Sequence, residues 1–460
     1  MNSPSPEQTY RYVSNAGALL GHGYVALRRD ALSILDRVLV EADPYRACLK
    51  AVRLEGDELT IAHLKLKVPA SARIWFFGAG KASFQIARGI EDKLRDRLHS
   101  GLVVCKEGQE GSLRRIDILY ASHPIPSEAS IAAGREMIHR TSQPRAGDIV
   151  LCGITGGSSA LLTMPGKGLG LADLQSLTKI LLTCGANIFE INAVRKHVSE
   201  VGGGRLAQKF DPGVHLINIT VSDVIGDALD YITDPTVADT STIAHAHLTL
   251  DRYDLWQRIS PAVRAYLSTD GGVSETPKKL PWPAEYNVLL LPASSPVEIA
   301  QRAASAIGYK PIVLSASFDG ESRSLGENFA AIAREVAQNR QPVDVPCALI
   351  GGGETIVRMN GFGGFGGPNQ EFALAGARHL PNGQPAVILG ADTDGTDGPT
   401  QVAGALCDLS TISRGANLGI DLEEALDGHN VTPALLKLDD VIITGATGTN
   451  VNDLKLLLLG

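Results

Sequence analysis

The 460-residue sequence has little of what marks a disulfide-bonded, zinc-binding or nucleic-acid-binding protein. Its six cysteines form no CxxC pair and no Cys/His spacing typical of zinc, so they predict small buried side chains in a reducing compartment. Acidic residues outnumber basic ones by 50 to 42, which disfavours binding to a phosphate backbone. No apolar run approaches the roughly 18 residues of a membrane helix, and the N-terminus lacks a secretory signal pattern. We therefore expect a cytoplasmic monomer or homodimer without nucleic-acid or membrane partners.

Glycine, by contrast, is abundant, with 49 of 460 residues against an average of about 7 per cent. Short apolar runs alternate with helical patterns, which predicts parallel α/β sheets covered by helices. These runs are residues 73–77, 102–105, 116–121, 148–152 and 215–221, then 287–291, 311–314, 347–350, 386–389, 403–407 and 441–443. An amphipathic helix is expected over 24–42, and the Ser-, Gly- and Pro-rich segment 268–286 is expected to be a linker. The predicted organisation is two α/β domains, residues 1–280 and 287–460.

Two glycine turns follow predicted strands and open helices. Ligands of open α/β sheets bind beyond the carboxyl ends of the strands, where helix N-termini present free N–H groups. Each turn could therefore hold a phosphate, although a plain strand-to-helix turn or a helix capped by its own serines explains the same residues. Neither turn matches the Walker or GxGxxG pattern. The candidate phosphate-binding residues are Gly78, Gly80 and Lys81 in the first turn, and Gly156, Gly157, Ser158 and Ser159 in the second.

A helix predicted over 188–201 opens with Asn187 and Glu190 at the spacing of a capping box. It carries two cations, Arg195 and Lys196, that no acidic residue one turn away neutralises. They form a polar stripe with Asn192 and Ser199. The stripe is either an anion clamp or a solvated helix face.

Two loops rich in aspartate follow predicted strands. One carries Asp223 and Asp227 after the strand 215–221, and the other carries Asp394 and Asp397 after the strand 386–389. Because Mg²⁺ in proteins is usually held by one or two carboxylates together with phosphate oxygens, each loop is a candidate metal site. Ordinary turn chemistry is the alternative, since Asp and Gly are common turn residues.

Three further segments follow predicted strands and carry polar groups. They contain His123 in HPIP, Glu354 in GGGE, and Asn450 in TGATGTN, which Asn452 follows. A glycine hairpin over 361–371 could serve as a lid or as a phosphate loop. Alone, each of these features is weak, and His123 could be a structural turn residue.

Taken in order, the motifs GAGKAS, HPIP, TGGSSALL, NAVRKHVSEVGGGRLA, SDVIGD, GGGETIV, NQEFALA, DTDGTDG and TGATGTNVNDL resemble the glycerate 2-kinase family. This resemblance implies an N-terminal Rossmann-like kinase domain and a C-terminal MOFRL domain, about residues 345–455, with the active site in the cleft between them. It also implies phosphorylation of the 2-hydroxyl of D-glycerate by ATP with Mg²⁺, giving 2-phospho-D-glycerate. The alternatives are an NAD(P)H-dependent hydroxypyruvate reductase, a kinase of a related small hydroxy acid, and a non-catalytic sensor. No segment combines GxGxxG with the ribose-binding acid of a nicotinamide site, which disfavours the reductase.

The resemblance also implies roles for the candidate residues. Catalysis falls to Lys81, Arg195 and Asp223, nucleotide binding to the glycines and serines of the two turns with Asn450 and Asn452, substrate binding to His123, Lys196 and Glu354, and Mg²⁺ binding to Asp227, Asp394 and Asp397. This chain departs from the family pattern in three places, one of which is Ala446, where relatives usually carry the proline of TGPTGTN. Phe365 and Pro368 stand in the glycine hairpin where many relatives carry arginine, and Thr233-Asp234-Pro235-Thr236 stands where relatives usually read SGPT. Losing arginines would remove bidentate contacts to carboxylate or phosphate, so substrate choice or rate could differ.

Overall fold

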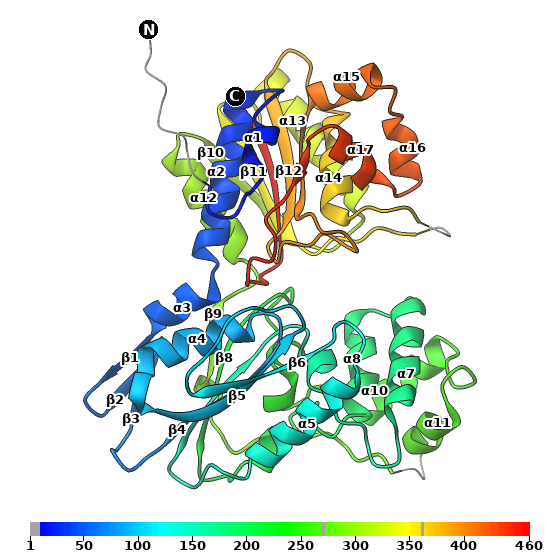
Figure 1. Cartoon of the computed structure of the whole chain (residues 1–460). Helices are drawn as coiled ribbons and strands as arrows, with labels where there is room; N and C mark the ends of the chain where they lie inside the picture. Colours follow the sequence, from blue (N-terminus) through cyan, green and yellow to red (C-terminus); the bar gives the residue numbers. More distant parts are fainter. Residues whose placement is uncertain (1–9, 269–271, 360–362) are drawn as a thin grey trace. The chain divides into compact units, whose positions relative to one another are not determined.

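A computed structural model describes residues 10–268, 272–359 and 363–460, and the chain divides into two compact units (Figure 1). The first unit contains the chain up to Asp43 together with Pro292–Gly460, and the second contains Pro44–Leu291. The six cysteines, all within these ranges, are free thiols, and five are buried. No helix of the described ranges is long and apolar enough to cross a membrane.

The Pro44–Leu291 unit is built on a six-stranded parallel sheet with the order β6-β5-β4-β7-β8-β9. When the six strands are numbered 1 to 6 in chain order, beginning with β4, the order across the sheet is 3-2-1-4-5-6, as in doubly wound folds. The direction of winding reverses between β4 and β7. The strands are β4 (Ile74–Ala79), β5 (Leu98–Lys106), β6 (Ile116–Ala121), β7 (Ile149–Ile154), β8 (His215–Val221) and β9 (Asn287–Leu291). A separate antiparallel sheet contains β1 (Val52–Glu55), β2 (Glu58–Ile61) and β3 (Leu64–Lys67).

Both faces of this parallel sheet are buried, as the continuous apolar character of β4 predicts. Ile74 and Phe76 pack into one core, and Trp75 and Phe77 pack into another on the opposite face. The unit's helices are α3 (Pro44–Ala51), α4 (Ser83–Leu94), α5 (Glu128–Arg140), α6 (Ser158–Leu161), α7 (Leu171–Thr183), α8 (Ile188–His197), α9 (Leu229–Ile232), α10 (Ile243–Arg252) and α11 (Pro261–Leu267).

The other unit has a mixed sheet with the order β10-β11-β15-β12-β13-β14, in which only β10 and β11 are parallel. Its strands are β10 (Lys310–Phe318), β11 (Cys347–Gly353), β12 (Ala386–Asp392), β13 (Gly404–Asp408), β14 (Val441–Ile442) and β15 (Asp453–Leu459). Its helices are α1 (Ala16–Leu19), α2 (Val25–Glu41), α12 (Ser295–Ala306), α13 (Ser322–Asn339), α14 (Pro368–Ala377), α15 (Leu409–Asn417), α16 (Leu422–Asp427) and α17 (Val431–Lys437). The two-domain α/β prediction is confirmed, but this second sheet is not parallel throughout.

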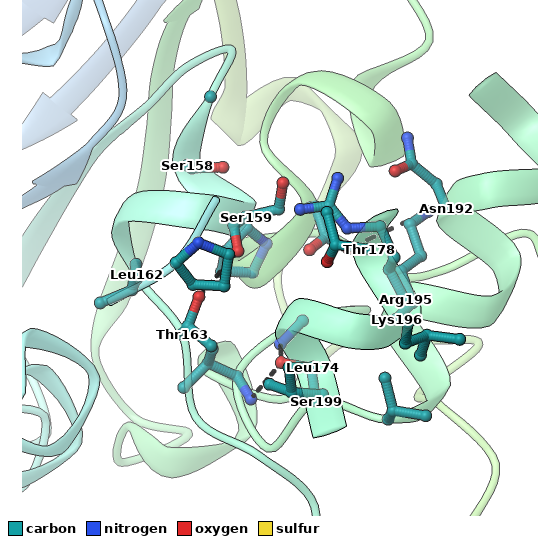
Figure 2. A pocket seen from close by; sticks show the side chains of 18 of the residues that line it. Ser158, Ser159, Leu162, Thr163, Leu174, Thr178, Asn192, Arg195, Lys196 and Ser199 are labelled. Carbon is teal, nitrogen blue, oxygen red and sulfur yellow. Dashed lines mark hydrogen bonds and ion pairs between the residues drawn. The ribbon is translucent and has the colours of Figure 1, made fainter. Parts of the chain in front are cut away.

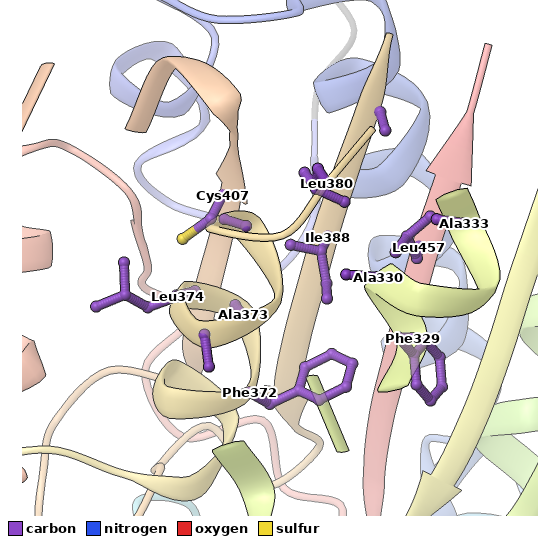
Figure 3. Close-up of a cluster of buried hydrophobic side chains, with 14 of the residues drawn as sticks. Phe329, Ala330, Ala333, Phe372, Ala373, Leu374, Leu380, Ile388, Cys407 and Leu457 are labelled. Atoms are coloured by element: carbon purple, nitrogen blue, oxygen red, sulfur yellow. The ribbon is translucent and has the colours of Figure 1, made fainter. Parts of the chain in front are cut away.

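The C-terminal strand β15, absent from the sequence prediction, lies in the middle of the mixed sheet. It pairs antiparallel with both β11 and β12, and all seven of its residues are buried. Leu457 belongs to a core in which the rings of Phe329 and Phe372 meet edge to face, with 5.1 Å between their centroids (Figure 3). The strand therefore joins the two halves of this sheet.

The compact units differ from the predicted domains at two places. Strand β9 completes the parallel sheet by pairing with β8, so the chain leaves that sheet at Pro292 and not near residue 285. Much of the predicted linker is also packed, since Thr276 is buried and Trp282 donates a hydrogen bond to the backbone oxygen of Val214. The second difference is that the N-terminal helix α2 belongs with the mixed sheet.

Helix α2 joins the mixed-sheet unit through a buried ion cluster. It packs against α12 and against β12 and β15 (Figure 1). The fully buried Arg28 guanidinium contacts Asp408 at 2.7 Å and Asp440 at 2.9 Å. Burial would raise the pKa of Asp408, but Arg28 holds it below its ordinary value. These charges are stable inside the protein only while they remain paired.

Replacement of Arg28 by alanine is predicted to destabilise the mixed-sheet unit by about 3–5 kcal/mol, because the buried Asp408 loses its ion-pair partner and Asp440 loses one cation while it keeps Arg414. Arg37→Ala removes a solvent-exposed pair with Glu41 on the same helix and is expected to cost less than about 1 kcal/mol. Urea denaturation of both variants and the parent protein measures these values. Equal effects of the two substitutions would contradict the role given to Arg28.

Candidate active site

The turns after β4 and β7 lie side by side where the winding of the parallel sheet reverses. The N–H of Lys81 donates to the backbone oxygen of Gly156 at 2.9 Å, and the N–H of Thr155 donates to that of Ala79 at 3.0 Å. The Thr155 hydroxyl in turn accepts a hydrogen bond from the N–H of Ala82 at 3.2 Å. The two predicted glycine turns therefore form one structure at the position where doubly wound folds bind ligands.

Three predicted site residues converge on the Gly156–Gly157 segment. A Cβ at Gly156 would overlap the Asp223 carboxylate, and one at Gly157 would lie 3.1 Å from His123 Nε2 and 3.4 Å from Lys81 Cγ. Gly157 also has φ +86°, a conformation that other residues seldom adopt. Only glycine allows a basic, an acidic and an imidazole side chain to approach this turn so closely.

A pocket of about 760 Å³, its open mouth included, begins at the same turn and continues between α7 and α8. Figure 2 shows Ser158 and Ser159 on one side of it and Asn192 and Arg195 on the other. The apolar part of the lining comprises Pro126, Leu162, Leu174, Leu177, Val198, Val201 and Pro235, and Thr163, Thr178, Tyr231 and Asp234 add polar groups. Apolar side chains together with polar and charged groups that can orient a ligand are features of a small-molecule site.

The two cations of α8 have different surroundings. The predicted capping box is confirmed, since Asn187 and Glu190 cap the first turn reciprocally. The Lys196 ammonium is buried and contacts Asp239 at 2.9 Å and Asp230 at 3.2 Å. Burial would lower the pKa of Lys196, but the neighbouring aspartates raise it above its ordinary value. Lys196 therefore neutralises buried carboxylates, whichever ligand the pocket takes.

Arg195 is half-buried on the pocket wall and forms no hydrogen bond or ion pair with the residues that the structure describes. Burial lowers its pKa, and the nearby Asp234 opposes that shift. Because a guanidinium stays protonated in proteins, the pocket presents a cation that lacks a close partner. This wall would attract a carboxylate or a phosphate.

Asp234 lines the pocket, although no sequence pattern beyond the TDPT departure indicated a function for it. Its Oδ1 accepts a hydrogen bond from the N–H of Gly203 at 2.7 Å and lies 4.0 Å from Lys196 Nζ. Burial raises its pKa to about 6, although Lys196 acts in the opposite direction. Thr178 and Tyr231, also unforeseen, line the same pocket.

Comparisons with known proteins agree with this geometry. The family model described as "Domain of unknown function (DUF4147)" matches residues 30–268, and that of the MOFRL family matches residues 347–453. A glycerate 2-kinase of Pyrococcus horikoshii is 38% identical over 436 residues, covering 94% of this chain and 97% of the relative. The chain belongs to the glycerate 2-kinase family. The family prediction from the sequence motifs is thus confirmed.

Two further comparisons qualify what membership of the glycerate 2-kinase family implies. The crystal structure of a glycerate kinase from Thermotoga maritima matches with a TM-score of 0.80 and 34% identity, covering 95% of this chain and 100% of that one. A relative from Agrobacterium vitis, named putative hydroxypyruvate reductase, is 37% identical over 385 residues, covering 83% of this chain and 98% of the relative.

In this family member, Asp397 has a structural role that the sequence did not indicate. Its fully buried carboxylate accepts four hydrogen bonds, from the backbone and side-chain nitrogens of Asn369 and Gln370 at the start of α14. These donors tie the carboxylate to the start of α14, and the use of Asp397 as a metal ligand stays a prediction. Asp394 Oδ1 likewise accepts two hydrogen bonds from Thr396.

Within the described part of the chain, no group of three or more His, Cys, Asp or Glu side chains is placed to hold a metal ion by itself. Asp227 is half-buried in the loop after β8, four residues beyond Asp223. Of the two carboxylates, Asp223 lies next to the glycine turn. One or two carboxylates are what Mg²⁺ needs when phosphate oxygens complete its coordination.

The remaining predicted residues belong to the mixed-sheet unit. Glu354 is exposed after β11, whereas Asn450 and Asn452 are buried before β15. Their ligand-binding roles stay predictions. Phe365 is 45% exposed and Pro368 begins α14, while Gly361 and Phe362 of the glycine hairpin lie outside the described residues.

Replacement of Gly156 by alanine is predicted to weaken binding of a non-hydrolysable ATP analogue about tenfold or more, because the added Cβ displaces Asp223 or the turn itself. Gly170→Ala, in the same unit, is the control, since its Cβ meets only Asp173 at an ordinary 3.7 Å. Isothermal titration calorimetry compares the two. Equal affinities would exclude the turn as a phosphate-binding element.

Asp234 is predicted to make stability depend on pH. The native protein keeps a proton on this residue up to about pH 6, whereas the ordinary value is 3.8. Its contribution to the unfolding free energy therefore falls as the pH rises between about 4 and 6, by about 3 kcal/mol at most. Asp234→Asn does not titrate, so its stability relative to the parent protein should rise over that interval. Denaturation curves that keep a constant difference across it would contradict the assignment.

Proposed function

We propose that this chain transfers the γ-phosphoryl group of ATP to the 2-hydroxyl of D-glycerate, giving 2-phospho-D-glycerate and ADP. The observation that supports this most strongly is the pocket wall at Arg195, beside a glycine turn on which Lys81, His123 and Asp223 converge. Glycerate offers a carboxylate for the guanidinium, and the turn offers backbone N–H groups for phosphate. The names of the Pyrococcus and Thermotoga relatives agree with this reaction.

The substrate is bound through its carboxylate. Arg195 forms charge-assisted hydrogen bonds with it, and Asn192 and Thr178, which line the same wall, complete its polar surroundings. Lys196 supports this arrangement without contacting the substrate, because its ammonium is engaged by buried aspartates. The pocket thus orients the substrate with one end anchored at α8.

The nucleotide phosphates lie against the glycine turns. Because Gly156 and Gly157 lack a Cβ, the side chains of Asp223, His123 and Lys81 can approach this turn closely. The backbone N–H groups of such a turn, next to a lysine, fit a phosphate group. Asp227 and Asp223 fit Mg²⁺, which when bound would neutralise phosphate charge. Lys81 supplies positive charge to the transferred group, and His123 contacts the phosphate or the hydroxyl.

Proton transfer is assigned to Asp223. As the glycerate O2–phosphorus bond forms, the bond between phosphorus and the oxygen bridging to ADP breaks, and the hydroxyl proton passes to the Asp223 carboxylate. Phosphoryl transfer requires positioning and charge neutralisation more than covalent chemistry, and these groups supply both. A coupled ADP-release assay with D-glycerate, followed by identification of the phosphate ester, tests the reaction. NADPH oxidation with hydroxypyruvate in place of ADP release would favour the reductase.

Arg195→Ala is predicted to raise the KM for D-glycerate about a hundredfold, because a charge-assisted contact to the carboxylate is lost. The KM for ATP should change little. Arg258→Ala, a substitution of an exposed arginine in the same unit, is the control. Steady-state kinetics with each substrate varied in turn measure both constants. A fall in kcat with an unchanged KM for glycerate would show that Arg195 does not bind the substrate carboxylate.

A further inference from the structure

Besides Arg195 and Lys196, the pocket is lined by a third charged residue, Asp234, that the proposed transfer does not use. Its side chain is 13% exposed and lines the cavity wall with Arg195. Oδ1 is engaged by the N–H of Gly203. Oδ2 accepts no hydrogen bond from any residue of the described ranges, so one carboxylate oxygen is available to a ligand in the pocket.

The other two aspartates around Lys196 offer no such oxygen to the pocket. Asp230 accepts hydrogen bonds from Lys196 and from the backbone and hydroxyl of Thr240. Asp239 accepts them from Lys196, Ser241 and Thr276. Neither residue lines the pocket. The three hydrogen bonds to Asp230 all reach its Oδ2, so the position of Asp234 in the pocket lining decides between these aspartates: it is the one whose free oxygen a ligand there could reach.

We propose, resting on the function above, that Asp234 accepts a hydrogen bond from the 3-hydroxyl of D-glycerate and so selects short 2,3-dihydroxy acids. The carboxylate, the 2-hydroxyl and the 3-hydroxyl occupy consecutive carbons of the substrate. When Arg195 holds the carboxylate and Asp234 holds the 3-hydroxyl, the 2-hydroxyl is the group left to face the Gly156–Gly157 turn. Asp234 is thus a specificity-determining residue that also sets which hydroxyl is phosphorylated.

The expected selectivity follows from the cost of leaving a polar group without a partner. A site built to bind a substrate hydroxyl rejects an analogue that lacks it by about 10⁴-fold or more when the site is closed to water. Because this pocket opens to solvent, water can partly satisfy Asp234, and a preference of about a hundredfold is expected. D-lactate, which has a methyl group in place of the hydroxymethyl group, is the matched analogue.

The test compares kcat/KM for D-glycerate and D-lactate in four proteins: the parent, Asp234→Ala, Asp234→Asn and Asp239→Asn. We expect the parent to prefer glycerate about a hundredfold and Asp234→Ala to prefer it less than about tenfold, through a higher KM for glycerate. Asp234→Asn keeps an acceptor oxygen and should retain most of the preference. Asp239→Asn disturbs the same ion cluster outside the pocket, so it should lower the melting temperature while the preference stays at the parent value.

Product analysis adds a readout that a purely structural role would not change. The parent should give the 2-phosphate alone, and Asp234→Ala should give a measurable share of 3-phosphate. An unchanged preference for glycerate in Asp234→Ala would overturn the proposal. A preference below about tenfold in the parent would also overturn it, and that measurement does not depend on the folding of the alanine variant. If the parent shows no ATP-dependent turnover, the proposed function fails instead. Calorimetric affinities of the four proteins for the two acids would then decide the role of Asp234 separately.

Discussion

The close approach of two backbone turns at the carboxyl ends of β4 and β7 is the constraint on which the site depends. Hydrogen bonds between Lys81 and Gly156, and between Thr155 and Ala79, hold the turns together. The contact is possible because β4 and β7 are neighbours in the parallel sheet and its winding reverses between them. Without a Cβ at Gly156, the Asp223 carboxylate from the neighbouring strand end reaches the same point. Fold topology and glycine placement together concentrate charged side chains at one turn.

The two cations of α8 differ in whether a buried carboxylate neutralises them. Charges taken out of water are stable only when they are paired, and Lys196 satisfies this condition with Asp230 and Asp239. Its neighbour Arg195 has no such pair in the described part of the chain and is half-buried on the pocket wall. An anion in the pocket would offset the cost of this partial burial. The positive charge of this half-buried guanidinium therefore favours a carboxylate in the pocket, in addition to any hydrogen bonds that the two groups form.

Features that depend on neighbouring residues in the sequence could be predicted. Features that depend on contacts between residues far apart in the sequence could not. The strands of the parallel sheet and the capping box of α8 were found, because β-branched runs and cap residues act over a few positions. The strand β15 was missed because its leucine-rich run carries no turn signal or alternation. The amphipathic pattern of α2 shows a buried stripe, but only the contact of Arg28 with Asp408 shows where it packs. The contacts of Asp397 with the start of α14 could not be predicted, because its donors lie far away in sequence.

The juxtaposition of Arg195 and Asp234 explains how one pocket can be both attractive and selective. If the two side chains formed a closed ion pair, the wall would be neutral and a small acid would have to break that pair to bind. Instead, Asp234 is anchored by Gly203 and lies near Lys196, while Arg195 has no hydrogen-bonded partner among the described residues. A ligand that satisfies both groups gains two polar contacts, whereas a ligand that satisfies one leaves the other unpaired in a partly apolar cavity. Selectivity of this kind requires no larger binding surface, which suits a substrate of only three carbons.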